Sequence, residues 1–446
     1  MRNRIGDLIA LLLTATPLTV FAVLPPEENV HGLTETKEFT AEQLVTAVLT
    51  RNPGLQGLEA ATAAAEYRIA PSGALDDPML TYAGAPETAG GPRGFQERVD
   101  LSQSLPWPGK LALRRDEARA RAQAKRESLE DRRLVLTAAA KRLFAEWAYI
   151  HRTLQIKHTH KKLLTELQRV AETQYAAGQA KQQDVLQAAV EEARIDTDII
   201  AHRRRKREVQ ALINGLLNRS PQSALPRPAP LPEPVAAPAL QTLRVFALKE
   251  HPALQRARAR IAEAQAKHNL AEKAYFPDFK LTAGYNTLWD DDDKRWNIGV
   301  SINLPFDFSN KRDASLEAAK AEVMRHRWQL TDQEIQLLAQ LEQGRARVQE
   351  SREVIKIHRQ RLLPLAKENL AAAVADYRAG RGRFLNVIDA ERQQLRTEDN
   401  LARAHADYLR AVATLERHAG RPREAIPSAA ATDLPASADG DASDQE

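Results

Sequence analysis

A run of 68 residues without glycine or proline, from Lys110 to Ala177, constrains this chain more than any other feature. Large apolar residues recur along it every seven positions, the spacing of a coiled-coil seam: Leu129, Leu136, Leu143 and Ile150. One helix of this length would extend roughly 100 Å, whereas the average helix of a globular protein has about 11 residues. We therefore predict a single long rod that no compact domain can contain.

The same plan is written twice in the chain. Three proline-containing landmarks return 199 positions later: Asn52-Pro53 as His251-Pro252, Asp77-Pro78 as Phe276-Pro277, and Leu105-Pro106-Trp107 as Leu304-Pro305-Phe306. A constant offset across several landmarks indicates an internal duplication. We predict two repeats, 39–220 and 239–421, each with helix, β-hairpin, long helix, tip and return helix. A proline-rich linker at 221–238 joins them as a stiff, extended segment.

The two ends of the chain have their own compositions. Arg2 and Arg4 precede an apolar run that closes with small residues, so residues 1–22 read as a signal peptide cleaved after Ala22, with an amino-terminal membrane anchor as the alternative. Residues 422–446 are rich in Ala, Ser, Asp and Pro, and we expect a disordered tail.

Composition excludes several kinds of chemistry. The chain has no cysteine, so it forms no disulfide, thiolate metal site or lipid-modified cysteine. A net charge of +5 over 446 residues is too dilute to indicate nucleic-acid binding. His151, His158 and His160 do not converge on one ion at their spacing, so no metal site is expected there. Without a catalytic triad, phosphate loop or zinc signature we expect neither an enzyme nor a cofactor.

Two segments of each half change from helical to alternating periodicity. In the second half, apolar residues alternate with polar ones over 279–285 and again over 296–304, and residues 79–84 and 95–105 correspond to them. Alternation over about nine residues with aromatics near the ends is typical of outer-membrane barrel strands, although a soluble half-buried hairpin is the alternative. Four strands cannot close a barrel, and an open edge cannot lie in lipid. Several copies must share one barrel, and a trimer with twelve strands is favoured over a dimer with eight.

The helices around the rod are also predicted. Thr40 and Gln43 form a capping box for a short helix that reaches Arg51, and Pro53 begins a second one. The return helix runs from about Lys181 to Asn218 and lies beside the rod. Pro364 should bend the second rod, as a static curve or as a hinge.

Duplicated halves with these motifs resemble the TolC-like outer-membrane efflux family over residues 39–421. The motifs that carry the resemblance are the tips Tyr175-Ala-Ala-Gly178 and Tyr377-Arg-Ala-Gly380, the segments after them, and the strand exits Leu105-Pro-Trp-Pro-Gly-Lys110 and Leu304-Pro-Phe306. The resemblance implies a mainly α protein with a small β-barrel part: a homotrimer whose 12-stranded outer-membrane β-barrel continues into a long α-helical periplasmic tunnel. The first exit motif looks most like the branch that serves heavy-metal cation pumps.

The resemblance also assigns residues. Asp184, Tyr377, Asn386 and Asp389 would form a periplasmic gate, with Tyr377 bonded to Asp184 and with Asn386 and Asp389 facing the tunnel axis. Two triplets would contact a periplasmic adaptor at the tips: Ala177, Gly178, Gln179 and Ala379, Gly380, Arg381. The strand-to-helix exits would be Pro106, Trp107, Pro108, Gly109, Pro305 and Phe306. The family's linking arginine falls on Gly382.

The expected function is therefore the exit duct of a tripartite efflux pump in the outer membrane of a Gram-negative bacterium. An RND-type pump of the inner membrane and a periplasmic adaptor would be its partners, outer-membrane lipid would surround the barrel, and heavy-metal cations are the candidate cargo. The alternatives are a type I secretion exit duct and a periplasmic coiled-coil adaptor or scaffold.

Overall fold

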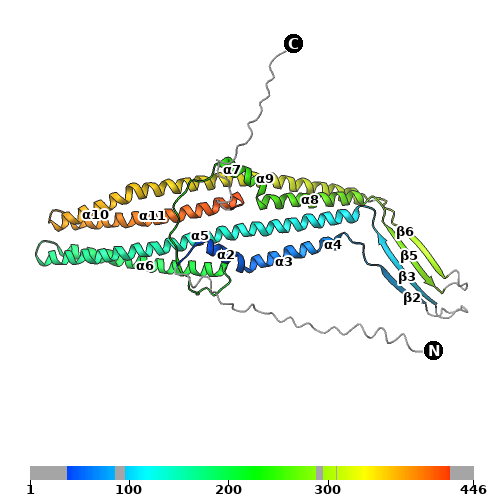
Figure 1. The fold of residues 1–446 in the computed structure, drawn as a ribbon, viewed down its shortest axis with the longest axis horizontal. Coiled ribbons are helices and arrows are strands. Elements are labelled where there is room, and N and C mark those ends of the chain that lie inside the picture. The colour runs from blue at the N-terminus through cyan, green and yellow to red at the C-terminus, as the bar shows by residue number, and fades with distance from the viewer. Residues whose placement is uncertain (1–37, 86–95, 288–294, 308, 422–446) are drawn as a thin grey trace, which may run out of the picture.

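The computed structural model describes residues 38–85, 96–287, 295–307 and 309–421. The predicted signal peptide and tail lie outside these residues. The molecule is a long bundle of helices with a β-sheet at one end and two helical tips at the other (Figure 1). Its elements are β1 (Glu38–Phe39), α2 (Ala41–Arg51), α3 (Pro53–Tyr67), α4 (Ile69–Ser72), β2 (Met79–Ala85), β3 (Gln96–Leu105), α5 (Lys110–Ala176), α6 (Gln182–Leu216), β4 (Arg227–Pro228), α7 (Leu240–Glu250), α8 (Pro252–Lys273), β5 (Phe279–Asn286), β6 (Trp296–Ile302), α9 (Lys311–Ile357), a π-helical turn η3 (His358–Leu362), α10 (Leu363–Arg378) and α11 (Phe384–Ala419).

The predicted rod is the central element of the bundle. Helix α5 runs unbroken for 67 residues and packs against α6, α8 and α11, while α2 and α3 also lie along it. Its heptad seam is buried at Leu129, Leu136 and Ile150, as the periodicity predicted. Trp147 adds to this core, and its indole N–H donates to the carbonyl of Pro226 at 3.1 Å. The linker between the halves is therefore fastened to the middle of the rod.

The short helices begin where the sequence predicts. Thr40 accepts from the backbone N–H of Gln43 while the Gln43 side chain accepts from the Thr40 N–H, so the capping box is complete. Asn52 caps α3 and His251 caps α8, each followed by proline at the first helical turn. The cap therefore occupies the same position in both halves. The order of elements from α2 to α6 is also repeated from α7 to α11.

The second rod is not one regular helix. Helix α9 passes into the π-helical turn at His358–Leu362, and α10 begins directly before Pro364. Proline has no N–H and its ring crowds the preceding turn, so the extra residue of a π-turn relieves that clash. The helix type therefore changes just before Pro364, and the bend predicted there stays a prediction.

The four long strands form one antiparallel sheet in the order β2-β3-β5-β6. The two predicted hairpins are joined through β3 and β5, with Leu101 opposite Ala283 and Val99 opposite Tyr285. Strand β6 ends at Ile302, two residues before the predicted end at Leu304. Within the described residues β2 and β6 each have one neighbour, so the sheet has two open edges.

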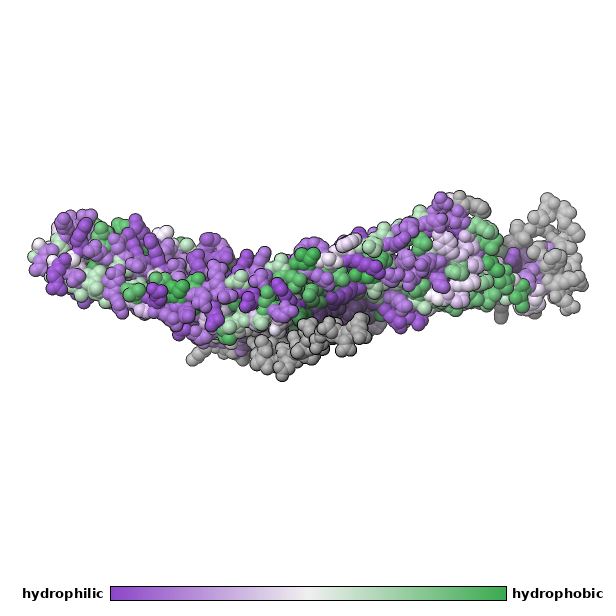
Figure 2. Space-filling model, turned by 90° about the horizontal axis from the view of Figure 1, so that it is seen from above, coloured by the Kyte–Doolittle hydropathy of each residue, from purple (hydrophilic) through white to green (hydrophobic). Residues whose placement is uncertain are grey.

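One face of this sheet is apolar across all four strands. The register aligns Leu80 with Leu101, Leu281 with Val300, and Ala283 with Ile298. Many of these side chains are exposed, Ile298 by 88% and Trp296 by 72%. Figure 2 shows hydrophobic residues gathered at this end of the molecule, beside rods with a largely hydrophilic surface. In the described residues no helix is both long and apolar enough to cross a membrane.

Candidate gate, tips and exits

The tips reverse the chain with the same geometry in both halves. Gly178 and Gly380 have φ values of 72° and 71°, in the left-handed region that favours glycine. The N–H of Gln179 donates to the carbonyl of Gln174 at 2.8 Å, and that of Arg381 donates to the carbonyl of Asp376 at 3.0 Å. These bonds close the helix ends. The six predicted tip residues are all exposed: Ala177, Gly178, Gln179, Ala379, Gly380 and Arg381.

Above the tips, the predicted contact between Tyr377 and Asp184 is present. The Tyr377 hydroxyl donates to Asp184 Oδ2 at 3.4 Å, and its ring lies 5.0 Å from that of Phe384. Burial of the tyrosine, together with the charge of Asp184, raises the pKa of Tyr377 to about 12. The amide of Gln174 also reaches the Tyr377 carbonyl at 3.4 Å. This group of contacts connects the first tip to the second.

Asn386 and Asp389 are exposed on α11, one turn apart. Asp389 has a partner in the same chain, because Arg392 Nη1 lies 3.4 Å from its Oδ1. Arg392 also binds Glu191 on α6, donating from Nε to Oε2 at 2.9 Å and from Nη2 to Oε1. The arginine holds the pKa of Glu191 below its usual range. An arginine link thus joins the two halves although Gly382 stands at the expected position.

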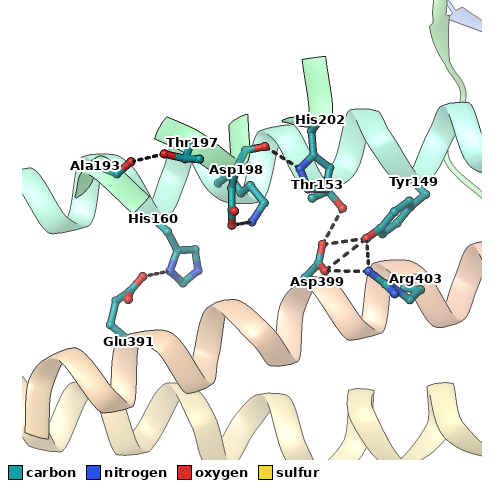
Figure 3. A network of polar contacts seen from close by, with 11 residues as sticks. Tyr149, Thr153, His160, Ala193, Thr197, Asp198, His202, Glu391, Asp399 and Arg403 are labelled. Carbon is teal, nitrogen blue, oxygen red and sulfur yellow. Dashed lines mark hydrogen bonds and ion pairs between the residues drawn. The ribbon is translucent and has the colours of Figure 1, made fainter. Parts of the chain in front are cut away.

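Farther from the tips, more polar contacts join α5 to α11 (Figure 3). Asp399 accepts from Thr153 at 2.8 Å and from the Tyr149 hydroxyl at 3.3 Å, and Arg403 donates to that hydroxyl at 3.1 Å. His160 lies between Glu391 and Glu398. Tyr149, Thr153 and His160 are all buried. The helical halves are therefore held together by partnered polar groups in addition to apolar packing.

Sequence reasoning missed this polar set, although a signal for it was present. His160 lies four residues after Ile156 and four before Leu164, so it occupies the buried seam. Glu191 lies three residues after Ala188 and four before Ile195, again on a buried face. A charged residue at a seam position costs stability unless it has a partner. Each of them therefore indicated an unidentified partner on another helix.

At the other end of α5, the first exit is fixed to the second half. The Trp107 ring stacks on Phe276 and Phe279, with centroids 5.1 and 5.8 Å away. The Trp107 N–H donates to Asp278 Oδ1 at 2.7 Å, and Lys110 Nζ donates to the same oxygen at 2.8 Å. Gly109, after Pro108, turns the chain with a φ of 92°. Pro106 is partly buried at the end of β3.

The second exit is more open. Phe306, after Pro305, is 63% exposed, and its carbonyl accepts from Arg312 Nη1 at 2.9 Å. Asp307 accepts from the backbone N–H groups of Arg312 and Asp313, so it caps the start of α9. The two exits occupy corresponding positions but make different contacts within one chain.

No group of three or more His, Cys, Asp or Glu residues in the described part of the chain is arranged to hold a metal ion. The three histidines of α5 have separate surroundings. His151 packs on Trp147 with ring centroids 4.6 Å apart, His158 is exposed, and His160 contacts carboxylates on both sides.

A four-stranded sheet with an exposed apolar face, continuous with helical rods that end in paired tips, is a fold that this chain shares with solved outer-membrane proteins. CusC has this fold, with a TM-score of 0.75 at 20% identity, covering 85% of this chain and 92% of that one. VceC of Vibrio cholerae has it too, with a TM-score of 0.74 at 17% identity over 86% and 96% of the two chains.

Residues 243–421, in the second half of the chain, match the family model described as outer membrane efflux protein. Cobalt-zinc-cadmium resistance protein CzcC of Cupriavidus metallidurans is 26% identical over 266 residues. That match covers 56% of this chain and spans 59% of the length of CzcC.

Proposed function

We propose that this protein is the outer-membrane exit duct of a tripartite efflux pump, working as a homotrimer with its helices in the periplasm. It conducts substrate passively, and conduction requires no catalytic residue. The observation that carries the proposal is the sheet: an exposed apolar face on four strands, with an open edge at each side.

The sheet supports a shared barrel on energetic grounds. Apolar side chains such as Ile298 and Trp296 gain from contact with lipid, whereas the unpaired backbone groups of an edge cost several kcal/mol in hydrocarbon. Pairing β6 of one chain with β2 of the next removes both edges. Three copies give twelve strands, an even number within the range of known barrels.

The proposed gate lies near the helical tips, at the end of the molecule opposite the sheet. In the proposal, Asp184, Tyr377, Asn386 and Asp389 lie at the narrow mouth of the tunnel, and opening separates the paired tips. The contact between Tyr377 and Asp184 and the link from Arg392 to Glu191 support this role, because both join helices of different halves. The exposed tip triplets around Gly178 and Gly380 are where a periplasmic adaptor would dock.

The proposed cargo is a divalent heavy-metal cation, delivered by an RND-type pump of the inner membrane and its adaptor. The named relative, a cobalt-zinc-cadmium resistance protein, supports this substrate class. Exposed carboxylates near the mouth would attract cations, although Arg392 offsets part of the charge of Asp389.

The function is tested by purification in detergent and reconstitution. We expect a heat-modifiable trimer in the outer-membrane fraction that forms ion-conducting pores in planar bilayers. A water-soluble monomer in the periplasmic fraction would overturn the proposal. Deletion of the gene should raise susceptibility to cobalt, zinc and cadmium while leaving susceptibility to hydrophobic drugs unchanged. If drug susceptibility rises instead and metal susceptibility does not, the proposed metal substrate is contradicted, whereas the proposed exit duct is not.

A further inference from the structure

The interface between the two helical halves contains a histidine placed between two carboxylates. His160 on α5 is 2% exposed, and Glu391 on α11, which it contacts, is 1% exposed. The His160 Nδ1 atom lies 2.8 Å from Glu391 Oε1, and Nε2 lies 3.5 Å from Glu398 Oε2. Figure 3 shows the ring directed from α5 towards α11 at Glu391.

This arrangement requires a charged ring. A neutral imidazole has one N–H and one lone pair, so one of the two carboxylates would face a lone pair. An imidazolium donates from both nitrogens and satisfies both acids. Burial alone would lower the pKa of His160, but the hydrogen bonds and charges of Glu391 and Glu398 outweigh it and raise the pKa to about 9.

The other charged groups nearby already have partners. On α5 itself, Lys157 Nζ bonds Asp198 at 2.7 Å and Lys161 Nζ bonds Asp196 at 2.6 Å, so both lysines are directed to α6. On α11, Arg392 binds Glu191 and the Gln394 amide donates to Glu398 at 2.9 Å. From α10, the charge of Lys367 acts on Glu398. The imidazolium of His160 is therefore the cation that contacts Glu391 inside the interface, and the charge of Arg392 also acts on Glu391.

His160 lies roughly 25 Å along α5 from the tip at Gly178, between the gate contacts and the Asp399 cluster. Helix α5 belongs to the first helical hairpin and α11 to the second. Any motion that separates these hairpins must part the ring from its carboxylates, leaving buried charges without partners.

We propose that His160 is a positioning residue of the gate: its imidazolium clamps α11 against α5, and loss of that charge lets the two hairpins separate and the channel open. This inference rests on the proposed channel function. In addition to the contacts near the tips, the clamp holds the hairpins together at a second place inside their interface. Its strength depends on the proton that charges the His160 ring.

The test compares conductance of reconstituted trimers between about pH 7.5 and pH 10, a window centred on the folded-state pKa of the ring. Wild-type protein should show an open fraction that rises with a midpoint near pH 9, the pKa of His160. At neutral pH the open fraction of H160Q should be roughly tenfold higher than that of wild type, which is the change expected for loss of a charge-assisted hydrogen bond. Its open fraction should show no midpoint near pH 9.

His158→Gln is the matched control, since it is the same substitution on the same helix at an exposed position. It should keep the wild-type profile. E398Q provides a second variant that retains the contact between His160 and Glu391. Because one of the two carboxylates that hold the proton is gone, its midpoint should move to lower pH. The clamp is refuted if H160Q keeps the wild-type profile, or if E398Q leaves the midpoint in place.

A distance measurement separates this inference from the proposed function. The chain has no cysteine, so spin labels can be introduced at Gln155→Cys on α5 and Arg396→Cys on α11, both exposed. In detergent-solubilised trimers the label separation should increase as pH rises through about 9 in wild type and should be large at all pH values in H160Q. If the distance changes with pH but the trimers do not conduct, the proposed channel function is contradicted and the clamp is supported. If the trimers conduct but the distance does not change, the clamp alone is contradicted.

Discussion

At the scale of single residues, this molecule places ionisable groups on helix faces that are otherwise apolar. Where a partner is present, as for His160 between Glu391 and Glu398, the charged form is favoured. Where no carboxylate of the described residues lies beside the ring, as for His151, whose buried Nε2 has no hydrogen-bond partner among them, the neutral form is favoured. Burial, together with the positive charges of Lys206 and Arg227, lowers the pKa of His151 to about 4.

The first prediction follows from the sign of this shift. In the unfolded chain His151 binds a proton near pH 6.5, but in the folded chain it does so only near pH 4. The folded state therefore loses stability as pH falls from 6.5 to 4, by up to about 3 kcal/mol. His151→Phe retains the contact with Trp147 and removes the titration, so it should melt higher than wild type at about pH 5 and show a smaller difference at about pH 7.5.

Thermal melting of the detergent-solubilised protein at both pH values measures this effect. His418, whose pKa is also lowered to about 4, remains in the variant, so some acid dependence should persist. Equal loss of melting temperature in wild type and His151→Phe would contradict the assignment.

At the scale of elements, the joint between sheet and rods depends on one carboxylate. Asp278, at the end of the segment that leads from α8 into β5, receives the N–H of Trp107 and the ammonium of Lys110. Lys110 is 8% exposed, so its ammonium group is largely desolvated. Those bonds hold the pKa of Asp278 below its usual range even though burial acts in the opposite direction.

The second prediction is that Asp278→Ala destabilises the protein by about 2 kcal/mol, because it leaves the buried ammonium of Lys110 with the carbonyl of Phe276 but without a carboxylate. Adding Lys110→Met should recover part of this loss, since the pair is then replaced by apolar groups. The melting temperatures of the two single variants and the double variant provide the measurement.

Asp116→Ala is the control for that series. Asp116 pairs with Arg119 at 3.2 Å on the exposed surface of the same helix, where both side chains are more than half exposed. We expect less than about 1 kcal/mol for this pair. If Asp278→Ala costs no more than Asp116→Ala, the joint does not depend on the buried pair.

At the scale of the whole molecule, the two ends face different surroundings. The sheet exposes an apolar face, while the rods and tips are mostly hydrophilic. The open edges at β2 and β6 lie on opposite sides of the four strands. A single chain therefore leaves both a face and two edges that other copies and lipid would cover in the proposed trimer.

The third prediction distinguishes the two faces of the sheet. Ile298→Lys puts a charge on the apolar face and should reduce the amount of heat-modifiable trimer in the outer membrane, at a cost of about 2–4 kcal/mol if the site lies at mid-bilayer. The control is Asn297→Lys, since Asn297 is the next residue of β6 and lies on the polar face. This substitution should be tolerated. Electrophoresis of heated and unheated membrane fractions compares the variants; similar trimer levels in both would argue against lipid contact at Ile298.

Particular residues show how far the sequence could predict the fold. The heptads of α5, the capping box at Thr40 and the alternation of 279–285 are local patterns, and the structure confirms all three. The contact between Tyr377 and Asp184 was also anticipated, through the family resemblance. The roles proposed for the gate and the tip residues stay predictions.

The partners of the buried charges could not be predicted. Arg392 and Glu191 are 201 residues apart, and His160 and Glu391 are 231 residues apart. Periodicity places each of them on a buried face, but no local pattern says which residue of another helix lies opposite. The register between α5, α6 and α11 decides that, and the register results from packing along the whole interface.

The amino-acid sequence by itself determined the long rods, their glycine reversals and the apolar face of the strands, because these depend on helix propensity, backbone angles and periodicities of a few residues. Only the tertiary structure decided that the two hairpins join through β3 and β5, that Trp107 and Lys110 meet Asp278, and that His160 lies between two acids. Those contacts exist because separate halves of the chain pack at one register, which brings together groups that are far apart in the sequence.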